Sequence, residues 1–128
     1  MIKIRHYRKA DEENLFAMIK AEGSEWADYH GEKYQQALAN SAVLVAHEGD
    51  ELCGFVRYKD DDGFGVYIYD LLVAPAKRGR NLGRALMERV CTEFPGMTVY
   101  VMSDIDEYYE KQGFRRIGSI FEVSLFAN

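Results

Sequence analysis

The sequence predicts one α/β domain built on a mixed central sheet of six to seven strands, flanked by about four helices. Three observations favour this class. The chain of 128 residues has the length of an ordinary single domain. Segments with strand-like alternation take turns with segments of helical periodicity. No linker, repeat or low-complexity stretch divides them, so residues 1–128 are expected to form one unit.

The first forty residues predict one strand followed by two helices. Residues 2–7 alternate apolar and polar side chains, which is typical of a strand. Residues 10–23 carry apolar side chains at helical spacing, between a candidate N-cap at Asp11 and a terminating Gly23. A second helix is expected near residues 31–39.

The middle of the chain predicts three strands. Residues 42–48 and 51–59 indicate a β-hairpin, because a Gly-Asp turn signal joins two β-rich runs. A longer strand is expected over residues 65–73, and Pro75 ends it.

The last third of the chain predicts alternating helices and strands. A helix is expected from residue 82 to about Phe94, and a buried strand over residues 97–103. A short helix over residues 104–113 precedes one or two final strands over residues 114–126.

Composition excludes several classes of protein. The formal net charge of −5 argues against a general nucleic-acid binder. Charges interrupt the apolar runs of the N-terminus, so neither a signal peptide nor a membrane span is expected. The two cysteines form no CxxC motif and predict free thiols in a reducing compartment, hence a cytoplasmic protein. The histidines lack metal-ligand spacing, so no metal site is expected.

Positive charge gathers around residues 78–83, whose sequence is RGRNLG, at a predicted helix start. A helix start presents unpaired backbone N–H groups and the positive end of the helix dipole. Gly79, Asn81 and Gly83 keep side-chain bulk low there, so an anion can approach the backbone closely. We therefore predict a phosphate or pyrophosphate cradle. The P-loop and dinucleotide-binding patterns are absent, and a solvated basic helix start is the structural alternative.

Two motifs resemble those of the GNAT superfamily of N-acetyltransferases. Residues 71–90 resemble its motif A, whose core is Q/R-x-x-G-x-G/A, and residues 108–114, YYEKQGF, are similar to its motif B. The order of elements extends the resemblance over nearly the whole chain, which implies an acyl-CoA N-acyltransferase-like fold. Asn81 stands where the family usually has glycine, but asparagine tolerates positive φ. Met102 stands where the family often has asparagine.

The resemblance implies acetyl-CoA as cofactor. Its pyrophosphate would lie on the helix start, and its pantetheine arm would run between strands 65–73 and 97–103. The N–H of Leu71 would stabilise the thioester oxyanion. The cofactor residues implied are Leu71, Leu72, Val73, Arg78, Gly79, Arg80, Asn81, Leu82, Gly83 and Arg84.

The same resemblance implies Tyr109 as the general acid that protonates the leaving thiolate. The alternative for Tyr109 is an aromatic core residue, and Tyr108 is expected in the core. The candidate general base is Asp70, with a structural hydrogen-bonding role as its alternative. Strand alternation places Asp70 opposite Tyr67, Tyr69 and Leu71 unless a bulge intervenes. Tyr67, Tyr69 or a water could also serve as base.

The segment after the first helix is expected to border the acceptor site. Its acidic and aromatic side chains suit a cationic amine, although an exposed polar loop with one anchoring tryptophan is the alternative. The residues are Glu25, Trp26, Asp28, Tyr29, His30 and Glu32.

The sequence thus predicts an N-acetyltransferase that acts on a primary amine, either a small molecule or a peptide. A non-catalytic acyl-CoA-binding sensor or interaction domain is the alternative function, and another phosphorylated ligand is a third. Homodimer formation is left open.

Overall fold

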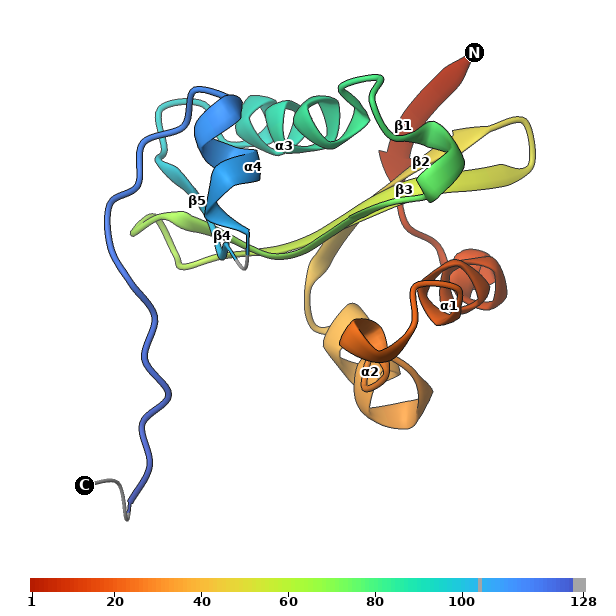
Figure 1. Ribbon diagram of the computed structural model, residues 1–128, viewed down its shortest axis with the longest axis horizontal. Coiled ribbons are helices and arrows are strands. Elements are labelled where there is room, and N and C mark those ends of the chain that lie inside the picture. The colour runs from red at the N-terminus through yellow and green to blue at the C-terminus, as the bar shows by residue number, and fades with distance from the viewer. Residues whose placement is uncertain (104, 126–128) are drawn as a thin grey trace.

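The computed structural model describes residues 1–103 and 105–125. They form a five-stranded sheet in the order β1-β2-β3-β4-β5, with helices on both of its faces (Figure 1). Strands β1 to β4 pair as successive antiparallel neighbours, whereas β5 joins β4 in parallel. The mixed α/β class expected from the sequence is confirmed.

The strands are β1 (Ile2–His6), β2 (Ala42–Glu48), β3 (Glu51–Asp60), β4 (Val66–Val73) and β5 (Val99–Val101). The helices are α1 (Glu12–Lys20), α2 (Gly31–Ala39), α3 (Leu82–Glu93) and α4 (Asp106–Lys111). Three 3-10 turns lie at Lys9–Asp11, Ser24–Trp26 and Pro75–Lys77. The expected elements between residues 2 and 113 all form, with ends shifted by a few residues. Asp104, the expected start of the last helix, lies outside the described residues.

Two apolar layers hold the helices to the sheet. On one face, Leu15 of α1 and Leu38 of α2 pack with Phe55 of β3. On the other face, Leu86 of α3 packs with Ile68 of β4, and α4 lies beside α3 (Figure 1). The β4–β5 end of the sheet therefore carries α3 and α4 on one face, while α1 and α2 cover the opposite face of β2 and β3.

The expected count of six to seven strands is wrong for the described residues, which form five. Residues 114–125, expected as strand, have no strand partner, and Figure 1 shows them leaving the body of the molecule as an extended chain. A strand needs a neighbouring edge for its hydrogen bonds as well as an alternating pattern. Residue 126, the last of that prediction, lies outside the described residues.

The described helices include none long and apolar enough to cross a membrane. Cys53 and Cys91 are both free thiols; Cys53 is buried, whereas Cys91 is exposed.

Candidate active site

The start of α3 forms a tight backbone turn. Gly79 has φ of 83° and Asn81, the N-cap residue, has φ of 58°. Both lie in the left-handed region, where glycine and asparagine carry the smallest penalty, so asparagine does replace the glycine usual in the family motif. The Asn81 side chain makes no capping hydrogen bond to the helix. The Asn81 side chain therefore leaves the first N–H groups of α3 available, and an anion cradle needs such available groups.

Gly83 lies where α3, α4 and β4 meet. A Cβ on Gly83 would stand 2.4 Å from the Tyr108 hydroxyl oxygen and 3.7 Å from Leu71 Cδ2. There is consequently no room for a side chain at this position. Tyr108, expected in the core, is instead 37% exposed and lays its hydroxyl over the first turn of α3. Partial burial raises the pKa of this phenol above its ordinary value.

Two of the three arginines assigned to the cradle make contacts within the protein. Arg78 donates from Nε to the Val73 carbonyl at 3.0 Å and from Nη2 to Glu22 at 2.6 Å. Arg84 donates to the carbonyl of Gln112 at 2.6 Å, at the C-terminal end of α4. Arg80 is exposed, and its side chain makes no hydrogen bond or ion pair within residues 1–103 and 105–125. Arg80 is therefore the cradle arginine that can contact a ligand without breaking an existing contact.

Strands β4 and β5 separate beside this cradle. Their parallel pairing ends at Ile68 and Val101, while β4 continues to Val73. The N–H of Ala74 donates to the carbonyl of Cys53 in β3, so the main-chain groups of Ala74 face β3. Successive residues of a strand direct their N–H and C=O groups to opposite sides. The main-chain groups of Leu71 and Val73 therefore face away from β3, toward the gap. Their neighbour Leu72 directs its side chain into the layer beneath α1 and α2, where it is 4% exposed.

A bulge in β4 changes the parity that the sequence suggested for Asp70. Arg57 pairs with Asp70 and Tyr58 pairs with Ile68, so Tyr69 is an extra residue in β4. As a result, Tyr69 and Asp70 both contact the guanidinium of Arg57. The Arg57 Cζ atom lies 5.3 Å from the Tyr69 ring centroid, and its Nε lies 2.5 Å from Asp70 Oδ2. The bulge allowed for in the sequence analysis is therefore present, and it removes the strict alternation between Asp70 and Tyr69.

Asp70 is held in a buried polar network. It is 5% exposed, and its Oδ2 accepts hydrogen bonds from Arg57 and from the Tyr34 hydroxyl at 2.7 Å. Arg57 also donates to Ser41 at 3.0 Å. Burial and the Asp70 carboxylate raise the pKa of the Tyr34 phenol above its ordinary range, so Tyr34 acts as a donor. This arrangement favours the structural alternative for Asp70 over direct proton transfer.

Tyr109, the neighbour of Tyr108 on α4, lies beside β5. It is half-buried against the apolar layer under α3 and lines a cavity of about 1120 Å³ beside β5. Its ring meets that of Tyr108 edge-on, with centroids 4.9 Å apart. The two adjacent phenols of motif B therefore occupy different environments, one at the cavity and one at the start of α3.

Comparison with known proteins identifies the family. The sequence model of the family described as "Acetyltransferase (GNAT) domain" matches residues 8–126. The chain belongs to the GNAT acetyltransferase family.

Relatives of this GNAT chain agree with the assignment. The uncharacterized N-acetyltransferase ycf52 of Pyropia yezoensis is 26% identical over 99 residues, covering 70% of this chain and 57% of that protein. The peptidyl-lysine N-acetyltransferase YjaB of Salmonella typhimurium is 29% identical over 128 residues, covering 92% of this chain and 86% of that protein. The chain spans about half the length of several curated relatives that it matches.

The fold also matches solved GNAT structures. A GNAT family acetyltransferase from Streptococcus pneumoniae superimposes with a TM-score of 0.78 at 22% identity, covering 98% of this chain and 99% of that one. At this identity the likeness concerns the fold.

The segment expected to border the acceptor site divides between core and surface. The Trp26 ring packs 6.2 Å from that of Phe55, and the Tyr29 ring packs 5.3 Å from that of Tyr34. Trp26 therefore packs on β3 of the sheet, and Tyr29 packs on α2. The polar members of the segment are exposed: Glu25, Asp28, His30 and Glu32.

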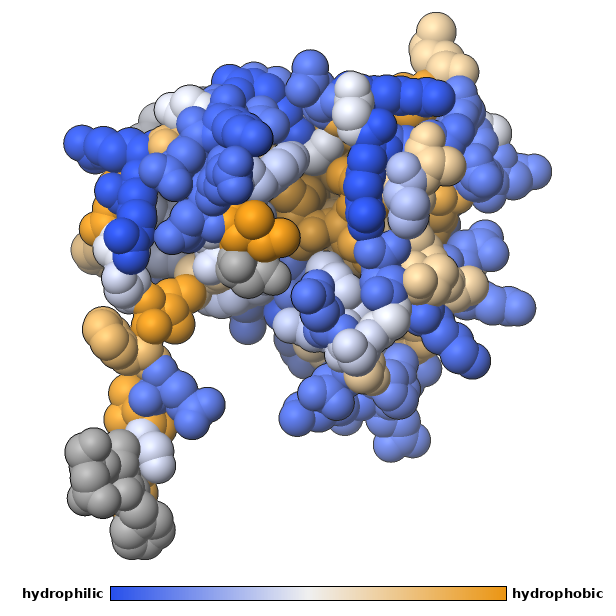
Figure 2. Space-filling view, in the orientation of Figure 1, coloured by the Kyte–Doolittle hydropathy of each residue, from blue (hydrophilic) through white to orange (hydrophobic). Residues whose placement is uncertain are grey.

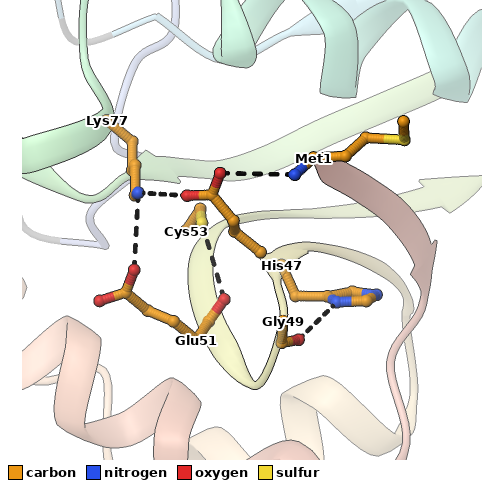
Figure 3. Close-up of polar contacts among 7 residues, drawn as sticks. Met1, His47, Gly49, Glu51, Cys53 and Lys77 are labelled. Atoms are coloured by element: carbon orange, nitrogen blue, oxygen red, sulfur yellow. Dashed lines mark hydrogen bonds and ion pairs between the residues drawn. The ribbon is translucent and has the colours of Figure 1, made fainter.

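A cluster of acidic residues and a thiol lies between the β2–β3 hairpin and the turn before α3 (Figure 3). Ligand atoms of Glu48, Glu51 and Cys53 lie within 4.8 Å of one another. The Lys77 ammonium lies 2.6 Å from Glu48 and 3.5 Å from Glu51, and the N-terminal ammonium lies 3.6 Å from Glu48, so two cations of the protein itself already pair with these carboxylates. The cluster ties the turn that precedes the cradle to the hairpin, and we assign no metal to it.

Sequence reasoning missed Arg57, Tyr34 and the position of Tyr108. Opposite charges at facing positions of β3 and β4 were the available signal for the Arg57–Asp70 pair, but the bulge makes the register unpredictable. Nothing in the local sequence distinguishes the environments of Tyr108 and Tyr109.

Proposed function

We propose that this chain is an N-acetyltransferase that moves the acetyl group of acetyl-CoA to a primary amine. The observation that carries the proposal is the joint geometry of α3 and β4. An uncapped helix start with two left-handed residues lies beside a strand whose outer main-chain groups face a gap. The helix start can hold a pyrophosphate, and the strand can pair with an extended arm that carries amide groups. Coenzyme A contains both of these groups.

Each part of the cofactor would have its own residues. The N–H groups around Asn81, Leu82 and Gly83 would bind the pyrophosphate, with Arg80 adding charge. The main chain of Leu71 and Val73 would pair with the pantetheine arm. To free the Val73 carbonyl for this pairing, Arg78 would give up its hydrogen bond to that oxygen. Acetyl-CoA supplies an activated thioester acyl group, and the Leu71 N–H would stabilise negative charge on the thioester oxygen.

For proton transfer, we propose Tyr109 as the donor to the leaving thiolate. The motif B resemblance and its half-buried position beside the cavity support this role. We propose that Asp70 has a positioning role, because both its bonding partners and its burial hold it in place. A water would then accept the proton of the amine; Tyr69, 38% exposed, is the alternative, and it would pass its own hydroxyl proton to solvent as it takes up that of the amine.

We propose that the acceptor is a primary amine carrying positive charge, either a small molecule or a peptide lysine. The acidic net charge and the exposed carboxylates Glu25, Asp28 and Glu32 favour the approach of a cation. The name of the Salmonella relative, a peptidyl-lysine N-acetyltransferase, supports the peptide form of this proposal. The free thiols are consistent with a cytoplasmic location, which we include in the proposal.

The test separates binding from turnover. Calorimetry with acetyl-CoA should show binding that weakens with salt, and the release of free thiol should be measured with lysine peptides, polyamines, and neutral and acidic amino acids. We expect turnover with the cationic amines, rising with pH as the amine loses its proton. Binding without turnover on any amine would favour the sensor alternative, and absence of binding would refute both.

A further inference from the structure

Glu22 has an environment that the stability of the fold does not explain. It follows the last turn of α1, where its N–H donates to the Ile19 carbonyl at 3.0 Å. Its side chain is 11% exposed, and within residues 1–103 and 105–125 its Oε2 is the only buried side-chain oxygen or nitrogen without a hydrogen-bond partner. A buried carboxylate oxygen without a partner is costly, and the C-terminal end of a helix is the negative end of its dipole. Stability alone therefore does not favour a glutamate here.

Within the described part of the chain, the cation that pairs with Glu22 is Arg78. Arg78 donates from Nη2 to Oε1 of Glu22 at 2.6 Å and from Nε to the carbonyl of Val73 at 3.0 Å. This contact joins the end of α1 to the turn before α3. Figure 2 shows apolar side chains at the surface between α3 and the α1–α2 pair, with hydrophilic side chains around them. Apolar surroundings solvate a charge poorly, so Glu22 depends on a cation for compensation.

We propose that Glu22 binds a second cationic group of the acceptor, so that the preferred acceptor is a diamine or a comparable amine with two positive charges. In the proposed function, on which this inference rests, Arg78 gives up the Val73 carbonyl to the pantetheine arm. Arg78 is then drawn toward the phosphates of acetyl-CoA, and Glu22 loses its compensating charge. An ammonium group that enters beside β4 restores the ion pair and gives Oε2 a hydrogen-bond donor.

The position of Glu22 fits a group remote from the reacting nitrogen. The thioester is proposed to lie at the N–H of Leu71. Val73, which Arg78 links to Glu22, lies two residues further along β4, a distance of about 7 Å. A carboxylate beside Val73 is therefore placed to hold the far end of an acceptor several carbon atoms long, while the other end of that acceptor reaches Leu71.

The experiment compares two acceptors of nearly equal length, diaminopentane and hexylamine, which differ in the second charge. The release of free thiol from acetyl-CoA gives kcat/KM for each. We expect the unmodified protein to prefer diaminopentane. Glu22→Gln keeps the shape of the side chain but removes its charge, and it should reduce this preference about 10- to 100-fold by raising KM for the diamine. Glu13→Gln, the matched control, removes an exposed carboxylate from the same helix and should leave the preference unchanged.

Calorimetry with acetyl-CoA separates this role from a structural one. Glu22→Gln should bind acetyl-CoA at least as tightly as the unmodified protein, because Arg78 then has one contact fewer to give up. Weaker binding would show that the ion pair supports the cradle, and would overturn the proposal. An unchanged preference in this variant, no preference in the unmodified protein, or acetyl-CoA binding without turnover of either amine would also overturn it. Absence of acetyl-CoA binding would instead refute the proposed function itself.

Discussion

The contact between Gly83 and Tyr108 allows a sharp test of how α3 and α4 meet. A methyl group at position 83 would lie 2.4 Å from the Tyr108 hydroxyl oxygen, closer than a carbon and an oxygen can approach. Its next contacts, 3.6 Å to Tyr108 Cζ and 3.7 Å to Leu71 Cδ2, are ordinary packing distances. The conflict in Gly83→Ala is therefore confined to one hydroxyl, which Tyr108→Phe removes.

The size of the effect follows from two opposing contributions. Replacing glycine by alanine inside a helix stabilises it by about 0.8–1 kcal/mol. Forcing an extra methyl group into a filled site costs about 1–3 kcal/mol, and the exposure of Tyr108 favours the lower end because the ring can swing outward. We expect Gly83→Ala to lower the free energy of unfolding by about 0–2 kcal/mol in the native background. In the Tyr108→Phe background it should raise that free energy by about 1 kcal/mol.

Urea unfolding of the four proteins in this double-mutant cycle measures the difference. The expected coupling between the two positions is about 1–3 kcal/mol. Additivity within about 0.5 kcal/mol would show that the hydroxyl does not lie over Gly83, and would refute this packing of α4 on α3. Acetyl-CoA affinity should stay nearly unchanged in both variants that carry alanine, because the motif A core, Q/R-x-x-G-x-G/A, accepts alanine at this position.

Three further predictions concern chemistry and stability. Tyr109→Phe should lower turnover by at least about tenfold while leaving acetyl-CoA affinity nearly unchanged, because only the donor hydroxyl is lost. Steady-state kinetics measures turnover and calorimetry measures affinity. Turnover within about twofold of that of the unmodified protein would show that Tyr109 is not the acid. Arg5 donates two hydrogen bonds to Asp11, and this bonding lowers the pKa of that carboxyl. The stabilisation that Asp11 gives the folded state is therefore fully present above the ordinary pKa of a carboxyl group. It is lost as the pH falls through the lowered pKa of Asp11 in the folded state. Asp11→Asn should lower the free energy of unfolding by about 1–3 kcal/mol near neutral pH, and this free energy should then fall less steeply at acid pH. An unchanged acid dependence in this variant would contradict the Arg5–Asp11 interaction as its source. Asp70→Asn should destabilise the fold by at most about 3–5 kcal/mol, because it removes the carboxylate that pairs with the partly buried guanidinium of Arg57. A large loss of turnover with unchanged urea unfolding would restore Asp70 as the base.

Much of the fold could be predicted from local sequence. The β2–β3 hairpin forms where a Gly-Asp turn joins two β-rich runs, and α3 begins directly after Asn81. Residues 114–125 show the limit of this reasoning, because their alternation satisfies the pattern of a strand but the described residues provide no adjacent edge. A pattern records which face would be buried, and pairing depends on a neighbour from elsewhere in the chain.

The candidate site divides in the same way. The sequence by itself determined the backbone turn that the proposed cradle requires, because the left-handed φ of Gly79 and Asn81 and the absence of a side chain at Gly83 depend on the residues themselves. Only the tertiary structure decided the surroundings of Asp70 and Tyr108. The β4 bulge brings Asp70 to Arg57, and the packing of α4 on α3 brings the Tyr108 hydroxyl to Gly83. Such contacts join residues distant in sequence, and their geometry follows from strand register and helix packing summed over the whole core, which no short stretch of sequence encodes.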